Sequence, residues 1–130
     1  MVQTSESVYC ELPLSSRTRL ILAAAAFLLV FFLVYFSVRR VIPNSTGTGI
    51  HRLEHVAAFA LLGLLLLPLS RTRAQEWLVA LAIAAFAVAM EYGQSLIFLN
   101  VGFEWWDVRD DIVGLLLAWL LIRSHRRKLV

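Results

Sequence analysis

The sequence predicts an all-α integral membrane protein, a bundle of four transmembrane helices with both termini in the cytoplasm. Hydrophobic residues make up 60% of its 130 residues and charged residues only 16%, whereas a soluble domain is nearer half apolar and a quarter charged. Four apolar segments, divided by short polar or basic stretches, follow one another along the chain. A chain of this length has room for a single domain.

Charge and cysteine content narrow the range of partners. The net charge is +3, but basic residues at the ends of membrane segments are ordinary topology signals. We therefore expect contact with the lipid bilayer and no nucleic-acid partner. Cys10 is the only cysteine, which excludes an internal disulfide and a metal site built from cysteines.

The first apolar segment follows a polar tail. Residues 1–19 are rich in serine and threonine, and we expect them to form a mostly disordered cytoplasmic tail. Residues 20–38 contain no charge over 19 positions, which is long enough to cross the hydrocarbon core of a bilayer. Arg39 and Arg40 follow in place of a small-residue cleavage site, so the segment is predicted to be a retained helix and not a signal peptide.

The second and third helices come after a loop. Residues 43–49 read P-N-S-T-G-T-G, a run of residues that interrupt helices. A second helix is expected over residues 50–69; it opens with the polar sequence H-R-L-E-H and ends near a proline. A third helix is expected over residues 77–99, and its first 14 residues are uncharged until Glu91.

The fourth helix is the most polar of the four. Its uncharged part covers only residues 112–122, which is too short to span a bilayer unless the helix begins near Trp105. Residues 100–104 then form a brief connection. We expect residues 20–124 to form the four-helix membrane domain and residues 125–130 a basic cytoplasmic tail.

The basic residues predict how this bundle is oriented. Four helices place both termini on one side, and the eight basic residues on that side are Arg17, Arg19, Arg71, Arg73, Arg123, Arg126, Arg127 and Lys128. The opposite side carries four, namely Arg39, Arg40, Arg52 and Arg109. Because basic residues concentrate on the cytoplasmic side of a membrane protein, both termini are predicted to lie inside.

Polar residues from three helices are predicted to gather near the outer side. Glu91 and Gln94 are three residues apart and share one helical face. Asp107, Asp111 and Gly114 share another face, where the glycine allows a second helix to approach closely. Ionisable residues inside a membrane are costly and tend to mark function. The candidate ligand-binding cluster comprises His55, Glu91, Gln94, Asp107 and Asp111.

Residues 50–122 resemble the VanZ-like family of small four-helix bacterial membrane proteins. That family has a histidine before an apolar helix containing a glycine, then Glu-x-x-Gln, then Asp-x3-Asn-x2-Gly. Here the corresponding residues are His55 and Gly63, Glu91 and Gln94, and Asp107 and Gly114.

The chain departs from the family pattern at three places. His51 and Arg52 stand where the family often has Asp-Lys, and Asp111 replaces the family asparagine. The arginine that commonly follows Glu-x-x-Gln is missing, with Asn100 and Val101 near its place. Any role that depends on that arginine or asparagine does not carry over to this chain.

The resemblance implies a place in the bacterial inner membrane and a role in the cell envelope. The name-giving member of the family is linked to resistance to the glycopeptide teicoplanin. We expect an accessory protein whose outer-leaflet site binds part of a cell-wall or glycan precursor, for example a lipid-linked one, or a glycopeptide antibiotic. An acidic cluster suits a cationic or neutral polar ligand better than a phosphate.

Two other functions remain open from the sequence. H-R-L-E-H matches the H-x-x-E-H pattern of metal hydrolases, in which zinc would be held by His51 and His55 with Glu91 as a third ligand. Alternatively, the polar residues serve only as hydrogen-bonding contacts between helices, in a structural or accessory subunit of a larger membrane complex. We favour binding over catalysis, expect no cofactor, and assign no catalytic residue.

Overall fold

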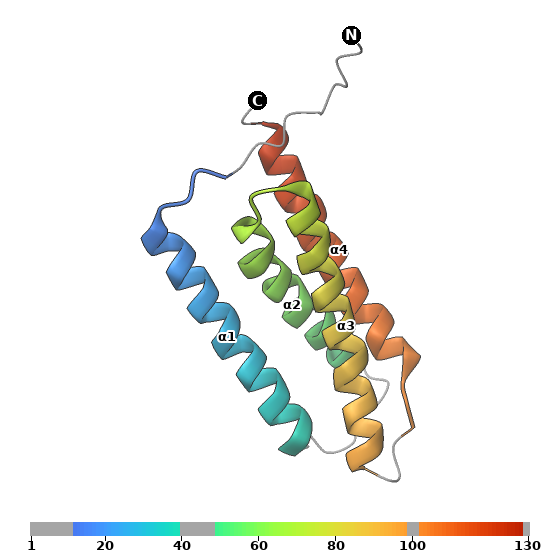
Figure 1. Ribbon diagram of the computed structural model, residues 1–130. Helices are drawn as coiled ribbons and strands as arrows, with labels where there is room; N and C mark the ends of the chain where they lie inside the picture. Colours follow the sequence, from blue (N-terminus) through green and yellow to red (C-terminus); the bar gives the residue numbers. More distant parts are fainter. Residues whose placement is uncertain (1–11, 40–48, 99–101, 129–130) are drawn as a thin grey trace.

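A computed structural model describes residues 12–39, 49–98 and 102–128 as a bundle of helices (Figure 1). The helices are α1 (Ser16–Arg39), α2 (Gly49–Leu66), α3 (Arg73–Ile97) and α4 (Trp105–Arg127), with a short 3-10 helix η1 (Leu67–Leu69) after α2. No strand occurs within these residues, so the prediction of an all-α fold is confirmed. The tail expected before residue 12 and most of the loop expected at 43–49 lie outside the described residues.

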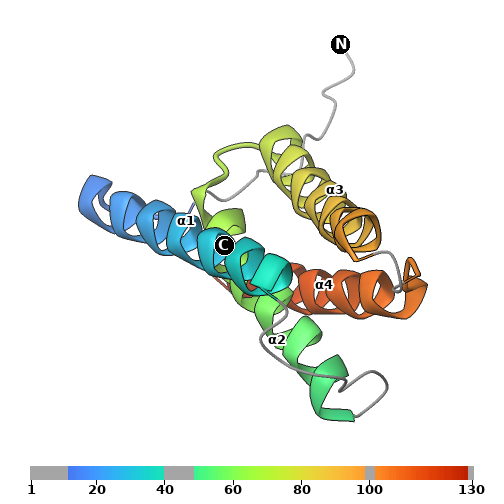
Figure 2. The ribbon, with the colours of Figure 1, turned by 90° about the horizontal axis from the view of Figure 1, so that it is seen from below.

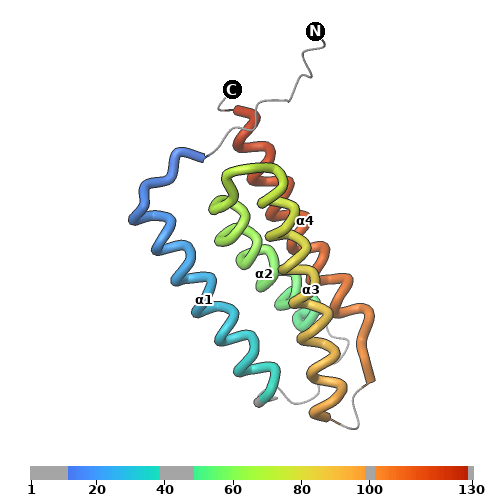
Figure 3. Tube along the Cα trace, in the orientation of Figure 1, coloured from blue at the N-terminus to red at the C-terminus, as the bar shows by residue number. Residues whose placement is uncertain are grey.

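Successive helices run in opposite directions (Figures 1 and 3). The start of α1, the α2–α3 connection and the end of α4 lie at one end of the bundle, which we call the basic end. The end of α1, the start of α2, the end of α3 and the start of α4 lie at the other, the site end. Figure 2 is turned to look onto the site end.

Three of the helices are long and apolar enough to cross a membrane. They are α1 over Ser16–Val38, α2 together with η1 over Gly49–Leu69, and α3 over Arg73–Ile97. Helix α4 has 23 residues, enough for a span of about 34 Å. Its first two turns, however, carry Asp107, Arg109, Asp110 and Asp111.

The helices extend beyond the uncharged segments that predicted them. Helix α1 begins at Ser16 and not at residue 20, and the Ser15 hydroxyl accepts a hydrogen bond from the Thr18 amide at 3.1 Å. Helix α3 begins at Arg73 and not at residue 77, because Thr72 caps it by accepting from the Gln75 amide at 3.2 Å. Polar side chains that satisfy first-turn amides allow a helix to start outside its apolar run.

Helices α2 and α4 form the closest pair in the bundle. A Cβ atom added to Gly114 would collide with the carbonyl oxygen of Val56 and lie 2.9 Å from the amide nitrogen of Ala60. One added to Gly63 would lie 2.7 Å from the Cβ of Ala118. The expectation that Gly114 lets another helix approach closely is confirmed, and that helix is α2.

Helix α1 lies at the edge of this core. Among its described side chains only Ala26 is buried, and most of its large apolar side chains are exposed. Polar bonds hold it at both ends. At the basic end an Nη1 atom of Arg19 donates to the carbonyl oxygen of Leu69 at 3.1 Å, and at the site end Gln94 donates to the Ser37 hydroxyl at 2.7 Å.

The basic end contains a buried ion pair. Arg126 Nη1 donates to Glu76 Oε2 at 2.7 Å, and the two side chains are only 7% and 9% exposed. Arg126 Nη2 also donates to the carbonyl oxygen of Leu67 at 3.2 Å. Residues 125–127, expected in a tail, therefore continue α4, and Arg126 joins α4 to α3 and to η1.

Candidate functional site

Two histidines on the first turns of α2 form one side of the candidate site. His51 and His55 are one helical turn apart, so their rings lie on the same face. The ring centroids are 4.7 Å apart and the ring planes cross at 81°. Their side chains are 24% and 23% exposed, so this side of the site keeps some access to its surroundings.

Three aspartates on the first two turns of α4 form the other side. Asp107, Asp110 and Asp111 are all buried. Negative charge near a helix N-terminus is favoured by the aligned peptide dipoles, which helps to place three carboxylates there. The close α2–α4 contact at Gly114 then brings the face that carries Asp107 and Asp111 against the histidines.

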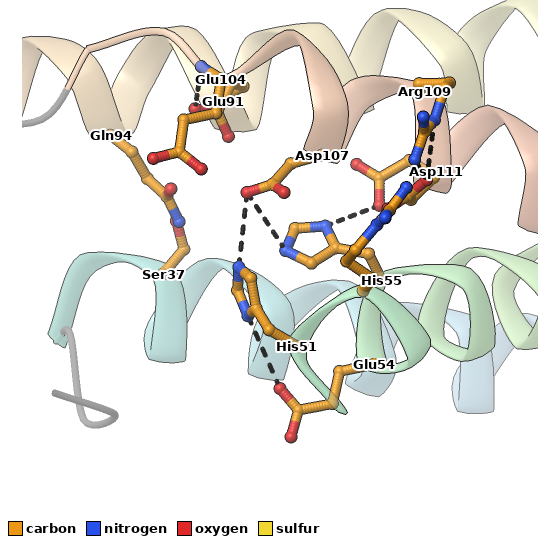
Figure 4. Close-up of polar contacts among 12 residues, drawn as sticks. Ser37, His51, Glu54, His55, Glu91, Gln94, Glu104, Asp107, Arg109 and Asp111 are labelled. Carbon is orange, nitrogen blue, oxygen red and sulfur yellow. Dashed lines mark hydrogen bonds and ion pairs between the residues drawn. The ribbon is translucent and has the colours of Figure 1, made fainter. Parts of the chain in front are cut away.

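The histidines and two of the aspartates contact one another directly (Figure 4). His55 Nδ1 lies 2.8 Å from Asp111 Oδ1, a short hydrogen bond. His51 Nε2 lies 3.4 Å from Asp107 Oδ2, and His55 Nε2 lies 3.7 Å from the same oxygen. One carboxylate oxygen of Asp107 is therefore shared by the Nε2 atoms of both histidines.

Asp110 has different partners. Arg52 Nε donates to its Oδ2 atom at 2.9 Å, and Arg109 Nε donates to its Oδ1 atom at 2.9 Å. The Arg109 guanidinium also lies over the Trp106 ring, 4.7 Å from its centroid. Two guanidinium groups thus compensate the charge of Asp110, while the histidines face Asp107 and Asp111.

Glu91 of α3 connects the site to the start of α4. Its Oε1 atom accepts a hydrogen bond from the backbone amide of Glu104 at 2.8 Å, and Glu91 is buried. Figure 4 draws its carboxylate near Asp107. Glu91 therefore holds the α3–α4 connection in place at the edge of the histidine–aspartate cluster.

The structure brings three of the five predicted residues into contact. These are His55, Asp107 and Asp111, and the buried Glu91 of α3 is drawn near Asp107 in Figure 4. Gln94 instead uses its amide on Ser37 and joins α3 to α1. The contact between Gln94 and Ser37 could not be predicted from the sequence, because a lone serine in an apolar helix gives no sign of its partner.

The residues that could hold a metal ion differ from the set that the H-R-L-E-H pattern predicted. His51, His55 and Asp107 each offer an atom, and these atoms lie within 4.8 Å of one another. Asp107 thus stands where Glu91 was expected as the third ligand. Glu54 lies on the far side of His51 from Asp107, with its Oε2 atom 3.8 Å from His51 Nδ1 (Figure 4).

The chemistry of this cluster follows from its donor atoms. Imidazole nitrogens and carboxylate oxygens can accept hydrogen bonds from a polar ligand or coordinate a cation. The side chains of His51 and His55 are partly exposed, whereas that of Asp107 is only 10% exposed. Comparison of the chain with protein-family models, with curated proteins and with solved structures found no match.

Proposed function

We propose that this protein is a four-helix protein of the bacterial inner membrane with both termini in the cytoplasm. Three helices of membrane-spanning length and composition support the membrane assignment. Helix α4 becomes compatible with a membrane because its acidic residues are buried against α2 and paired. The basic end collects most of the arginines, which supports a cytoplasmic position for that end.

The orientation predicts the result of reporter fusions. A reporter that is active only outside the cytoplasm should be inactive when fused after residue 130 and active when inserted near Thr46. A reporter that is active only in the cytoplasm should give the opposite pattern. Activity of the first reporter at the C-terminus would contradict the orientation and would place the site end in the cytoplasm.

We further propose that the protein is a VanZ-like envelope protein whose site end binds a polar ligand in the outer leaflet. The observation that carries this proposal is the contact of His55 with Asp107 and Asp111, beside the buried Glu91, at one end of the bundle. Charged groups at such a depth are costly, and their usual reason is function. The resemblance over residues 50–122 supports a cell-wall or glycan precursor, or a glycopeptide antibiotic, as the ligand.

The arrangement also indicates which ligand groups the site would accept. The two arginines next to the cluster, Arg52 and Arg109, donate to Asp110 and not to Asp107. A carboxylate beside two histidines attracts an amine, an amide or a hydroxyl group and repels a phosphate. The proposed ligand is therefore recognised through a cationic or neutral polar part.

Two isosteric variants separate this binding role from a purely structural one. In Glu91→Gln the amide oxygen can still accept from the Glu104 amide, so the α3–α4 connection should stay intact. Asp107→Asn likewise keeps its shape next to the histidines. We expect the wild-type protein to confer teicoplanin resistance on a sensitive host. Both variants should remain folded, with small changes in thermal stability, and should lose that resistance.

The matched control is Glu104→Gln, which makes the same chemical change at a residue whose backbone amide, unaltered by the substitution, donates to Glu91. It should keep the wild-type phenotype. Full resistance in folded Glu91→Gln and Asp107→Asn would contradict the binding role. The cluster would then be a set of contacts between helices, as in a structural subunit of a larger membrane complex.

A further inference from the structure

We propose that His51, His55 and Asp107 form a binding site for one divalent zinc-like metal ion. The proposal uses part of the cluster assigned above to ligand binding, but it depends neither on the identity of that ligand nor on an envelope role. It rests on the distances between the three side chains, on the carboxylate next to the Nδ1 atom of each histidine, and on the chemical type of the three ligand atoms.

The distances fit a metal better than they fit hydrogen bonds. Asp107 Oδ2 lies 3.4 Å from His51 Nε2 and 3.7 Å from His55 Nε2. Direct N–H···O bonds are about 2.7–3.2 Å long, so neither contact is a good one. In a tetrahedral zinc site each ligand atom lies about 2.1 Å from the ion, which places neighbouring ligand atoms roughly 3.4 Å apart.

The outer nitrogen of each histidine faces a second carboxylate. His55 Nδ1 lies 2.8 Å from Asp111 Oδ1, and His51 Nδ1 lies 3.8 Å from Glu54 Oε2. Metal-binding histidines commonly donate their other ring N–H to a carboxylate, which fixes the ring and keeps the proton off the coordinating nitrogen. The His55–Asp111 contact is a hydrogen bond of this kind, whereas the His51–Glu54 separation is an ion-pair distance. The Nε2 atoms of both histidines face Asp107 Oδ2 (Figure 4).

The donor atoms favour a particular class of ion. Two imidazole nitrogens and one carboxylate oxygen are typical ligands of zinc and of related transition metals, whereas calcium and magnesium prefer oxygen ligands alone. Asp107 and the nearby charges of Asp111 and Glu91 balance a dication. The partial exposure of His51 and His55 leaves room for a fourth ligand from outside the protein.

Metal binding to the purified full-length protein tests this proposal. The protein is solubilised in detergent, stripped with a chelator, dialysed and titrated with zinc chloride. Wild-type protein should hold about one zinc per chain at micromolar free zinc. His51→Ala, His55→Ala and Asp107→Asn should each lose stoichiometric zinc, because a site with three protein ligands cannot spare one.

Two further variants show whether the ion sits at the proposed atoms. Asp111→Asn changes only the outer partner of His55 and should weaken zinc binding by about 10–100-fold without abolishing it. His125→Ala removes an exposed histidine at the basic end and should leave binding unchanged. Cobalt in place of zinc should give the strong visible absorption of a tetrahedral site in the wild type and in His125→Ala.

Two results would overturn the metal site. One is wild-type protein that binds no zinc at these concentrations, and the other is zinc retained in folded Asp107→Asn and His51→Ala. Either result, combined with loss of teicoplanin resistance in Glu91→Gln, would leave the proposed ligand-binding role standing. Stoichiometric zinc together with full resistance in Glu91→Gln and Asp107→Asn would remove the ligand-binding role and keep the metal site.

Discussion

Replacement of Gly114 by valine is expected to separate α2 from α4 and to unfold the bundle. Even the first carbon of a side chain at this position would collide with the backbone of α2 at Val56. Overpacking against side chains costs about 1–3 kcal/mol, and a helix backbone yields less than a side chain does. We expect a loss of more than about 3 kcal/mol for Gly114→Val, and a smaller loss in the same direction for Gly114→Ala.

Thermal unfolding of the purified variants in detergent measures this effect. Gly93→Ala is the matched control, because a Cβ atom at Gly93 has nothing within 4 Å. Alanine favours a helix over glycine by about 1 kcal/mol, so Gly93→Ala should unfold at the wild-type temperature or slightly above it. A Gly114→Ala protein as stable as the wild type would show that α2 and α4 are not in backbone contact.

Loss of one partner of the Arg126–Glu76 pair is expected to have the second largest effect. Both side chains are almost fully buried, so Arg126→Met would leave the Glu76 carboxylate buried without its guanidinium. Breaking a buried ion pair in this way typically costs about 3–5 kcal/mol. The same variant also frees the carbonyl oxygen of Leu67 from its bond to Arg126.

A double-mutant cycle separates the pair from its surroundings. Replacing both charges, as in Glu76→Gln with Arg126→Met, should restore much of the stability lost by Arg126→Met alone, because no buried charge remains. Arg127→Met is the control, since Arg127 is exposed, and it should change the unfolding temperature little. If the effects of Glu76→Gln and Arg126→Met simply add, the two side chains do not interact in the folded protein.

The number and order of the helices could be predicted from the sequence, because long uncharged segments have few other stable forms. The predicted boundaries were wrong by several residues where polar side chains begin a helix. Ser15 and Thr72 satisfy first-turn amides, so α1 and α3 start before their apolar runs. Helix α2 was predicted to continue to residue 69, but Pro68 lies in the 3-10 turn η1 that follows it.

The site could be predicted only in part. Helical spacing placed Asp107, Asp111 and Gly114 on one face, and this face does contact α2. Spacing along a helix does not say which other helix that face will meet. The sequence therefore proposed Glu91 as the third ligand of the histidine pair, whereas Asp107 faces both histidines and Glu91 binds the Glu104 amide.

Arg126 illustrates a second limit of sequence reasoning. A basic residue near the end of the last helix is normally counted as a topology signal, and that count is the same whether the side chain is exposed or buried. Its burial depends on Glu76, which is 50 positions away on α3. Neither the residues around Glu76 nor those at the end of α4 give a local sign of that pairing.

The pairing of α2 with α4 also has a consequence for biosynthesis. His55 bonds to Asp111, 56 positions later in the chain. A ribosome adds about 5–20 residues per second, so α2 waits roughly three to ten seconds before its acidic partners are made. During that time the nascent chain presents two histidines and an arginine without the aspartates that they contact in the finished protein. Synthesis of α4 then completes the polar cluster and the apolar core together, so both depend on the last helix to be made.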